Sequence, residues 1–148
     1  MNTDRIEREI VIDAPVQRVW QVVTQADHLG RWFGDAGAEV DLRPGGALVL
    51  RWKEFGTGHH RVESVEPPTY FAFRGSITPD ATDVDDNSTL VEFFLTPQGE
   101  STVVRVVESG FDGLALPAGE RARYREGNVD GWRIKGDELR DYVAALVS

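Results

Sequence analysis

The stretch Gly127 to Leu146, GNVDGWRIKGDELRDYVAAL, decides the fold because its apolar residues recur at helical spacing. If the stretch is helical, one stripe of the helix holds Trp132, Leu139, Val143 and Leu146, and Tyr142 lies beside this stripe. Gly136 lies on this stripe, where a helical glycine costs about 1 kcal/mol relative to alanine and a missing core side chain costs roughly 2–5 kcal/mol. We therefore expect a bulky neighbour, a closely approaching backbone or a ligand to fill the space beside Gly136.

The N-terminal part of the chain predicts one strand followed by two short helices. Residues Arg5 to Ile12 favour the strand, and Asp13-Ala14-Pro15 favours a helix start in which the Asp13 carboxylate is the cap. The residues that follow have helical spacing, so that one buried stripe holds Val16, Val19, Trp20 and Val23. A second short helix is expected from Ala26 to Trp32.

The middle of the chain predicts an antiparallel meander, because β-type segments alternate with short turns. Alternation places on one concave face Leu48, Leu50, Trp52, Phe71, Phe73, Val91, Phe93, Leu95, Val104, Val106 and Glu108. The intervening residues point to the opposite, outer face of the sheet, and the apolar ones among them are Val49, Leu90, Phe94, Val103 and Val107. They are either exposed residues of high β-propensity or part of a homodimer interface. The predicted fold is α+β, a single domain over residues 1–148, with the C-terminal helix across a curved sheet.

Composition limits the partners and the location of the chain. A net charge of -9 disfavours nucleic acid and anionic membrane, because both require a basic face. No apolar run approaches the roughly 20 residues that cross a bilayer, and the first residues do not resemble a signal peptide. Cysteine is absent, which fits a reducing compartment. We therefore expect a cytoplasmic protein with no nucleic-acid or membrane partner.

The motifs of the common catalytic and cofactor sites are absent from the sequence. It contains no Gly-x-Ser-x-Gly elbow, no phosphate-binding glycine loop and no dinucleotide fingerprint. The adjacent His59 and His60 would point to opposite faces of a strand, and His28 lies in the predicted second helix. The acidic loop from Asp80 to Asp86 lacks the glycine and glutamate of an EF-hand. We expect neither a metal nor a cofactor.

Two ionisable residues are candidates for chemistry on the concave face. Glu108 shares the parity of Val104 and Val106, and an unpaired carboxylate there would have a raised pKa. It is either a loop anchor that pairs with an arginine or a backbone amide, or a contact for a ligand hydroxyl or amine, or a general acid or base. His60 is a hydrogen-bonding pocket residue if it points inward. No catalytic residue is assigned beyond these two candidates.

Six short motifs, in order over nearly the whole chain, resemble one family. They are Ile12-Asp13-Ala14-Pro15 with Val19-Trp20, Arg31-Trp32-Phe33, Leu42-Arg43-Pro44-Gly45-Gly46, Val65-Glu66-Pro67-Pro68, Glu108-Ser109-Gly110-Phe111, and Gly131-Trp132 with Leu139. Together they resemble the START-like or SRPBCC superfamily and, within it, the domain of the activator of heat-shock protein 90 ATPase. This resemblance implies the helix-grip fold, in which about seven strands wrap a long C-terminal helix and leave a pocket. The family usually presents a leucine at Gly136, so the glycine implies an enlarged or reshaped cavity.

The resemblance leaves three functions open, because the superfamily includes lipid and hormone carriers, aromatic polyketide cyclases and co-chaperone domains. The first is binding of a small apolar or aromatic molecule in the cavity. The second is an acid-base enzyme of the cyclase, dehydratase or hydrolase kind, and the third is a co-chaperone-like domain that docks on a chaperone or on its own copy. The expected ligand-binding residues are Trp32, Phe33, Trp52, His60, Phe71, Phe73, Phe93, Val106, Glu108, Phe111, Trp132 and Gly136.

Overall fold

One antiparallel sheet and three α-helices make up residues 4–77 and 87–146, the part of the chain that the computed structural model describes. The elements are β1 (Arg5–Ile12), α1 (Val16–Thr24), α2 (Ala26–Trp32), β2 (Ala38–Val40), β3 (Ala47–Trp52), β4 (Gly56–Glu66), β5 (Tyr70–Ser76), β6 (Ser88–Gln98), β7 (Ser101–Ser109), the 3-10 turn η1 (Phe111–Gly113) and α3 (Ala118–Leu146). The acidic loop from Asp80 to Asp86 lies outside the described residues. Within them, no helix has the length and apolar character needed to cross a bilayer.

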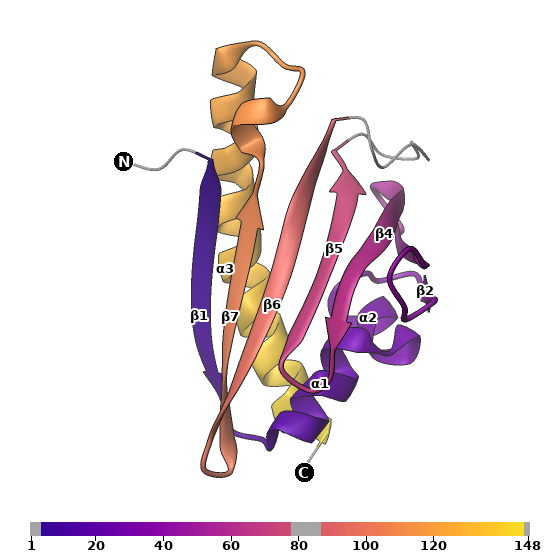
Figure 1. Ribbon diagram of the computed structural model, residues 1–148, viewed down its shortest axis with the longest axis vertical. Coiled ribbons are helices and arrows are strands. Elements are labelled where there is room, and N and C mark those ends of the chain that lie inside the picture. The colour runs from indigo at the N-terminus through magenta and orange to yellow at the C-terminus, as the bar shows by residue number, and fades with distance from the viewer. Residues whose placement is uncertain (1–3, 78–86, 147–148) are drawn as a thin grey trace.

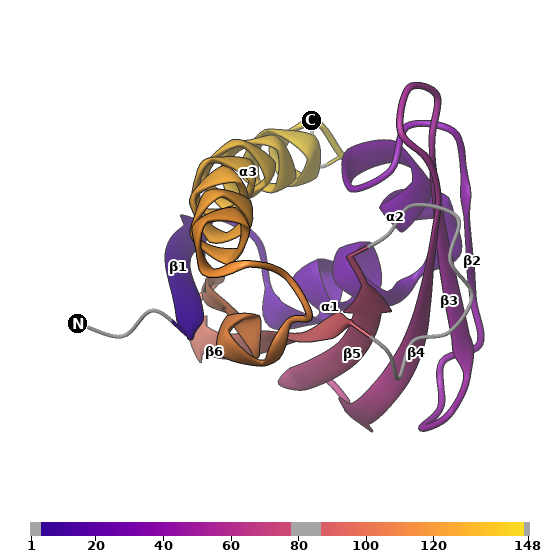
Figure 2. The ribbon, with the colours of Figure 1, turned by 90° about the horizontal axis from the view of Figure 1, so that it is seen from above.

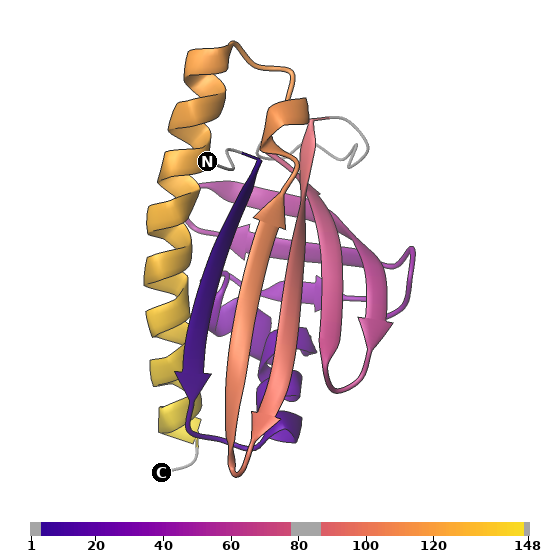
Figure 3. The ribbon, with the colours of Figure 1, turned by 60° about the vertical axis from the view of Figure 1, so that its left-hand side comes forward.

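The sheet has seven strands in the order β1-β7-β6-β5-β4-β3-β2, and all neighbouring pairs are antiparallel. Strands β2 to β7 follow one another as a meander, and β1 pairs with β7 at the edge (Figure 1). The sheet curves strongly, so that β1, β7 and β6 run along α3 while the strands farther away run across it (Figure 3). The predicted α+β helix-grip fold is confirmed.

The concave face of the sheet is apolar, as the alternation predicts. Its fully or nearly fully buried side chains are Leu48, Leu50, Phe71, Phe73, Val91, Phe93, Leu95, Val104 and Val106. The predicted stripe of α1 is also buried, except that Val16 is only half-buried. The core therefore lies between this face and the three helices, and it holds α1 and α2 in the positions from which they close one side of the fold.

Two helix ends differ from the sequence-based expectation. Helix α1 begins after Pro15 without a side-chain cap, and Asp13 instead accepts a hydrogen bond from the Ser101 hydroxyl at 3.3 Å. Helix α3 begins at Ala118, well before the predicted Gly127, because its polar first turns are fixed by contacts outside the helix, such as the Arg125 guanidinium donating to the Arg5 carbonyl at 2.9 Å. At the other end, Leu146 is 38% exposed and does not join the buried stripe.

Gly136 lies where α3 packs closely against β1. A Cβ at this position would stand 2.5 Å from Cδ1 and 3.2 Å from Cγ1 of Ile10, a buried β1 side chain. Of the three fillers expected from the sequence, the bulky neighbour is therefore the one present. The enlarged cavity predicted from the resemblance is not present at Gly136, because the Ile10 side chain occupies the space beside the glycine.

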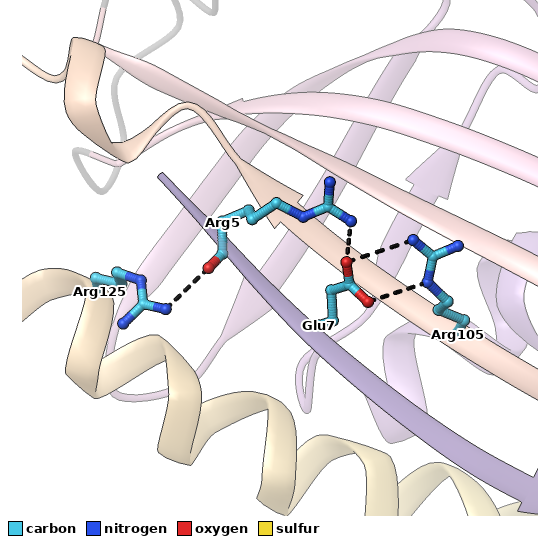
Figure 4. A network of polar contacts seen from close by, with 4 residues as sticks. All are labelled: Arg5, Glu7, Arg105 and Arg125. Carbon is cyan, nitrogen blue, oxygen red and sulfur yellow. Dashed lines mark hydrogen bonds and ion pairs between the residues drawn. The ribbon is translucent and has the colours of Figure 1, made fainter. Parts of the chain in front are cut away.

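The outer face of the sheet carries ion pairs among its apolar residues. Glu7 pairs with both Arg5 and Arg105, and its Oε2 lies 3.3 Å from Nε of Arg105 (Figure 4). The guanidinium of Arg105 also lies over the ring of Phe94, 5.0 Å from the ring centroid, and the Tyr70 ring packs on Phe94 at 5.0 Å. The chain's own charged groups thus cover part of this face, and a homodimer across it stays a prediction.

Candidate ligand-binding site

A cavity of about 580 Å³ lies between α3 and the concave face of the sheet. Its lining comes from the strands β3 to β7, from Phe33 at the end of α2, and from α3, which closes the concave side (Figure 2). The volume falls within the roughly 300–1,000 Å³ that small-molecule pockets occupy. The exposed side chains of Phe55 and Ile134 are also part of the lining and mark its solvent-facing rim.

Half of the predicted ligand-binding residues line this cavity, namely Phe33, Trp52, His60, Phe73, Glu108 and Trp132. The others lie outside the lining and are Trp32, Phe71, Phe93, Val106, Phe111 and Gly136. Two of them make packing contacts: Trp32 donates its indole N–H to the Val22 carbonyl at 2.8 Å, and Phe111 packs against Tyr124 at 6.1 Å. Alternation identifies the face on which a residue lies, but another side chain can cover it. Contact of the twelve residues with a ligand stays a prediction.

Aromatic rings in mutual edge or tilted contact form the apolar wall of the cavity. The Phe33 ring is central, at centroid distances of 5.5 Å from Trp132, 6.2 Å from Trp52 and 6.4 Å from Phe73. Trp52 is held in place because its indole N–H donates to the Phe33 carbonyl at 2.9 Å. Such ring contacts contribute roughly 0.5–1.5 kcal/mol each beyond the area they bury. The rings of the wall are therefore held in place by contacts with one another.

Glu108 occupies the polar side of the cavity and joins the sheet to α3. On β7, its Oε2 accepts from the Thr89 hydroxyl of β6 at 2.6 Å. Its Oε1 accepts from the Asn128 amide at 3.0 Å and from the Trp132 indole N–H at 2.8 Å, both on α3. The partners that hold the carboxylate are thus neutral side chains, and not the arginine or backbone amide that an anchoring role suggested.

The electrostatic environment of Glu108 is set by burial. The residue is only 4% exposed, and this burial raises the pKa of its carboxyl, while the hydrogen bonds from Thr89, Trp132 and Asn128 oppose the rise. Burial and then the Glu108 charge raise the pKa of Tyr124 to about 12, so its phenol stays protonated. The polar side of the cavity therefore holds one acidic group among neutral donors.

His60 points inward from β4 and lies in a slot made by two glycines. Its neighbours on the same face are Gly58, two residues earlier, and Gly75, its cross-strand partner on β5. A Cβ on Gly75 would collide with Cδ2 of the imidazole, and a Cβ on Gly58 would lie 2.8 Å from Cε1. Nδ1 donates to the Leu48 carbonyl at 3.2 Å, and this leaves Nε2 as an acceptor. Within the described ranges, no group of three ligating side chains gathers to hold a metal ion.

The stability of the protein is expected to depend on pH through His60. Burial lowers the pKa of its imidazole to about 4, and the charge of His59 acts in the same direction. Because the unfolded chain protonates near the ordinary pKa of 6.5, the stabilisation is complete above that value and is lost as the pH falls towards 4. A His60→Asn variant keeps a donor for Leu48 but does not titrate. Between pH 7 and pH 5, we expect its unfolding free energy to fall by about 2 kcal/mol less than that of the wild type.

Urea unfolding at the two pH values measures this difference, and the comparison cancels the opposing titration of Glu108. His59→Asn is the matched control, since residue 59 lies on the opposite face of β4 and its substitution should leave most of the pH dependence intact. An unchanged pH dependence in His60→Asn would contradict the prediction, because it would show that the imidazole has the same pKa in the folded and the unfolded protein.

A polar stripe on α3 was missed by the sequence analysis. The residues Tyr124, Asn128, Gly131 and Lys135 all line the cavity and follow one another at spacings of about one helical turn. The charge of Lys135 is balanced there by an ion pair, because its Nζ lies 3.0 Å from Glu138. The same Nζ donates to the Trp32 carbonyl at 3.3 Å. The periodicity was present in the sequence, but a search for apolar stripes alone passes over a stripe whose members are polar or glycine.

Comparisons with known proteins place the chain in a family. The family model described as activator of Hsp90 ATPase homolog 1-like protein matches residues 13–144. Comparison with curated protein sequences gives no match. Among solved structures, MLL2253 from Mesorhizobium loti is similar, with a TM-score of 0.79, 19% identity, and coverage of 97% of this chain and 98% of that one.

Two further solved structures have the same fold. The Aha1 dimer from Colwellia psychrerythraea gives a TM-score of 0.71 at 18% identity, over 94% of this chain and 95% of that one. DynU16, from the dynemicin biosynthetic locus, gives a TM-score of 0.71 at 23% identity over 95% of this chain, which spans only 47% of the DynU16 chain. Likeness at these identities concerns the fold alone. Because the family model covers nearly the whole sequence and the fold agrees with it, the chain belongs to the activator of Hsp90 ATPase homolog 1-like family.

Proposed function

We propose that this chain is a cytoplasmic protein that binds a small apolar or aromatic molecule in the cavity between α3 and the sheet. The observation that carries the proposal is the cavity itself, about 580 Å³ of space between α3 and the concave face of the sheet. Protein interiors are ordinarily close-packed, so a space of this size lined by aromatic rings is typical of a small-molecule site.

The chemistry of the lining supports an apolar ligand with a few polar contacts. Phe33, Trp52, Phe73 and Trp132 supply flat aromatic surface, and Glu108 is buried beside them. Small-molecule sites typically combine a mainly apolar wall with a small number of placed polar groups that fix the orientation of the ligand. The cavity has this composition.

Filling the cavity from α3 is expected to block binding. Gly131 lines the cavity, and a Cβ on it would meet open space. We expect Gly131→Phe to place its ring in the cavity and to weaken the binding of N-phenyl-1-naphthylamine, an uncharged fluorescent aromatic, by at least tenfold. Fluorescence titration measures the affinity, and urea unfolding verifies that the variant is folded.

Gly127→Phe provides the matched control. Gly127 is an exposed glycine of the same helix, lies outside the cavity lining, and also has open space around a Cβ. We expect this variant to bind the probe as the wild type does. Equal affinities for both variants, or no saturable binding by the wild-type protein, would contradict the proposed function.

A second candidate function, acid-base catalysis in the same cavity, is favoured by the position of Glu108. Its carboxyl has a pKa raised by burial, as general acids and bases often have, and His60 supplies an unprotonated Nε2 in the same lining. We expect the protein to accelerate exchange of the acidic C–H hydrogens of 2-tetralone, an apolar bicyclic ketone, in D₂O, as followed by proton NMR. An undiminished rate in Glu108→Gln would exclude Glu108 as the acid-base group, and no acceleration by the wild-type protein would contradict this function.

A further inference from the structure

Glu108 is an acidic group that faces an aromatic cavity without a basic partner. Its three hydrogen bonds come from a hydroxyl, an amide and an indole, none of which carries a charge. Among the described residues, no lysine, arginine or histidine contributes to the shift in the pKa of its carboxyl. Buried charges in proteins are ordinarily paired, because an unpaired one is costly in a medium of low polarity. When Glu108 is ionised, a cation in the cavity would supply the missing partner.

The remaining charges of the cavity lining do not supply that cation. The basic residues among the lining are His60 and Lys135. Burial keeps the His60 imidazole neutral by lowering its pKa to about 4, and Lys135 is engaged with Glu138 and the Trp32 carbonyl. With the Lys135 charge balanced by Glu138, Glu108 is the acidic residue of the lining that has no cationic partner when it is ionised.

The hydrogen-bond capacity of the carboxylate leaves room for one more donor. An ionised carboxylate has about four acceptor positions. Oε1 accepts from both Asn128 and Trp132, whereas Oε2 accepts from Thr89 alone. A donor brought by a ligand would complete the set on Oε2, and a positively charged donor would also favour the ionised form of the carboxyl.

The cavity wall suits an organic cation. The indole of Trp132 both lines the cavity and donates to Glu108 through the N–H at its edge, so an aromatic ring lies beside the carboxylate. Aromatic faces attract ammonium groups through the ring quadrupole. The net charge of -9 acts at longer range and raises the local concentration of cations over anions around the protein.

The geometry points to an aromatic or apolar amine as the ligand, with its protonated nitrogen against Oε2 of Glu108 and its apolar part against Phe33, Phe73 and Trp132. This inference rests on the proposed binding function and narrows it to one chemical class. Glu108 then has two roles in one position, since it joins α3 to the sheet and selects the charge of the ligand.

Three naphthalene compounds of similar shape test whether the cavity selects its ligand by charge. Isothermal titration at neutral pH compares 2-naphthylmethylamine, which is protonated, with 2-naphthylmethanol, which is neutral, and with 2-naphthoic acid, which is anionic. We expect the amine to bind at least tenfold more tightly than the alcohol and the acid to bind most weakly. Equal affinities for the amine and the alcohol would overturn the inference while leaving the proposed function intact, whereas no binding of any compound would overturn both.

Variants assign the preference to Glu108. Glu108→Gln keeps the shape of the side chain, and we expect it to abolish the amine preference while changing the affinity for the alcohol by less than threefold. Asn128→Lys leaves Glu108 intact and supplies an internal ammonium from α3, so it should abolish the same preference even if Glu108→Gln does not fold. Glu126→Gln, at an exposed acidic residue of α3 outside the cavity lining, is the control and should keep the preference. A preference that persists in both Glu108→Gln and Asn128→Lys would overturn the inference.

Discussion

The Gly136→Leu variant is expected to unfold with a free energy about 3 kcal/mol lower than that of the wild type. A Cβ at this position already lies 2.5 Å from Cδ1 of Ile10, and the rest of a leucine side chain would separate α3 from β1. Overpacking of this kind typically costs about 1–3 kcal/mol and occasionally more. The cost exceeds the roughly 1 kcal/mol gained when a helical glycine is replaced. Urea unfolding followed by circular dichroism measures the difference.

Gly127→Leu is the control for Gly136→Leu, because it makes the same substitution on the same helix at an exposed position with open space around a Cβ. We expect it to leave stability unchanged or to raise it by up to about 1 kcal/mol. A stabilised Gly136→Leu with weakened binding of N-phenyl-1-naphthylamine would mean that Gly136 opens the cavity after all, contrary to its contact with Ile10.

The Trp132→Ala variant is expected to show the largest loss, about 4 kcal/mol of unfolding free energy. The indole is 8% exposed and packs at centroid distances of 5.5 Å from Phe33 and 6.0 Å from Phe93. Its removal leaves a void between α3 and the sheet. It also takes one of the three donors from the buried carboxylate of Glu108, which is costly in itself.

Trp132→Phe separates the two contributions to that loss. The phenyl ring keeps most of the packing against Phe33 but has no N–H for Glu108, so we expect a loss of about 1–3 kcal/mol. Both variants are compared by urea unfolding under the same conditions. Equal losses in Trp132→Ala and Trp132→Phe would show that the hydrogen bond, and not the packing of the ring, accounts for the contribution of Trp132.

Local periodicity was sufficient to predict most of the elements. Strand β1 and helix α2 have the predicted bounds, Arg5–Ile12 and Ala26–Trp32. The strand alternation also identified the inward face, including the position of Glu108. These predictions succeed because the periods of strands and helices are properties of the backbone itself and are recorded in the order of the residues. The start of α3 was not predicted, since its first turns lack an apolar stripe and depend on contacts such as Arg125 with β1.

The candidate site was predicted only in part, because lining a cavity is a property of the packed protein. His60 and Phe73 lie in the lining, whereas Phe71 and Phe93 have the same inward orientation but are covered. The polar stripe that includes Asn128 had a helical period that was available in the sequence. The contribution of this stripe to the site depends on the packing of α3 beside β7.

The sequence by itself determined the order of the elements, the inward face of the sheet and the presence of an acidic residue on that face. The tertiary structure alone decided that Gly136 meets Ile10 and that three neutral donors surround Glu108. The physical reason is that local periodicity fixes the direction of each side chain within its own element. The distance between elements far apart in the chain is fixed only by how a long helix packs against a curved sheet.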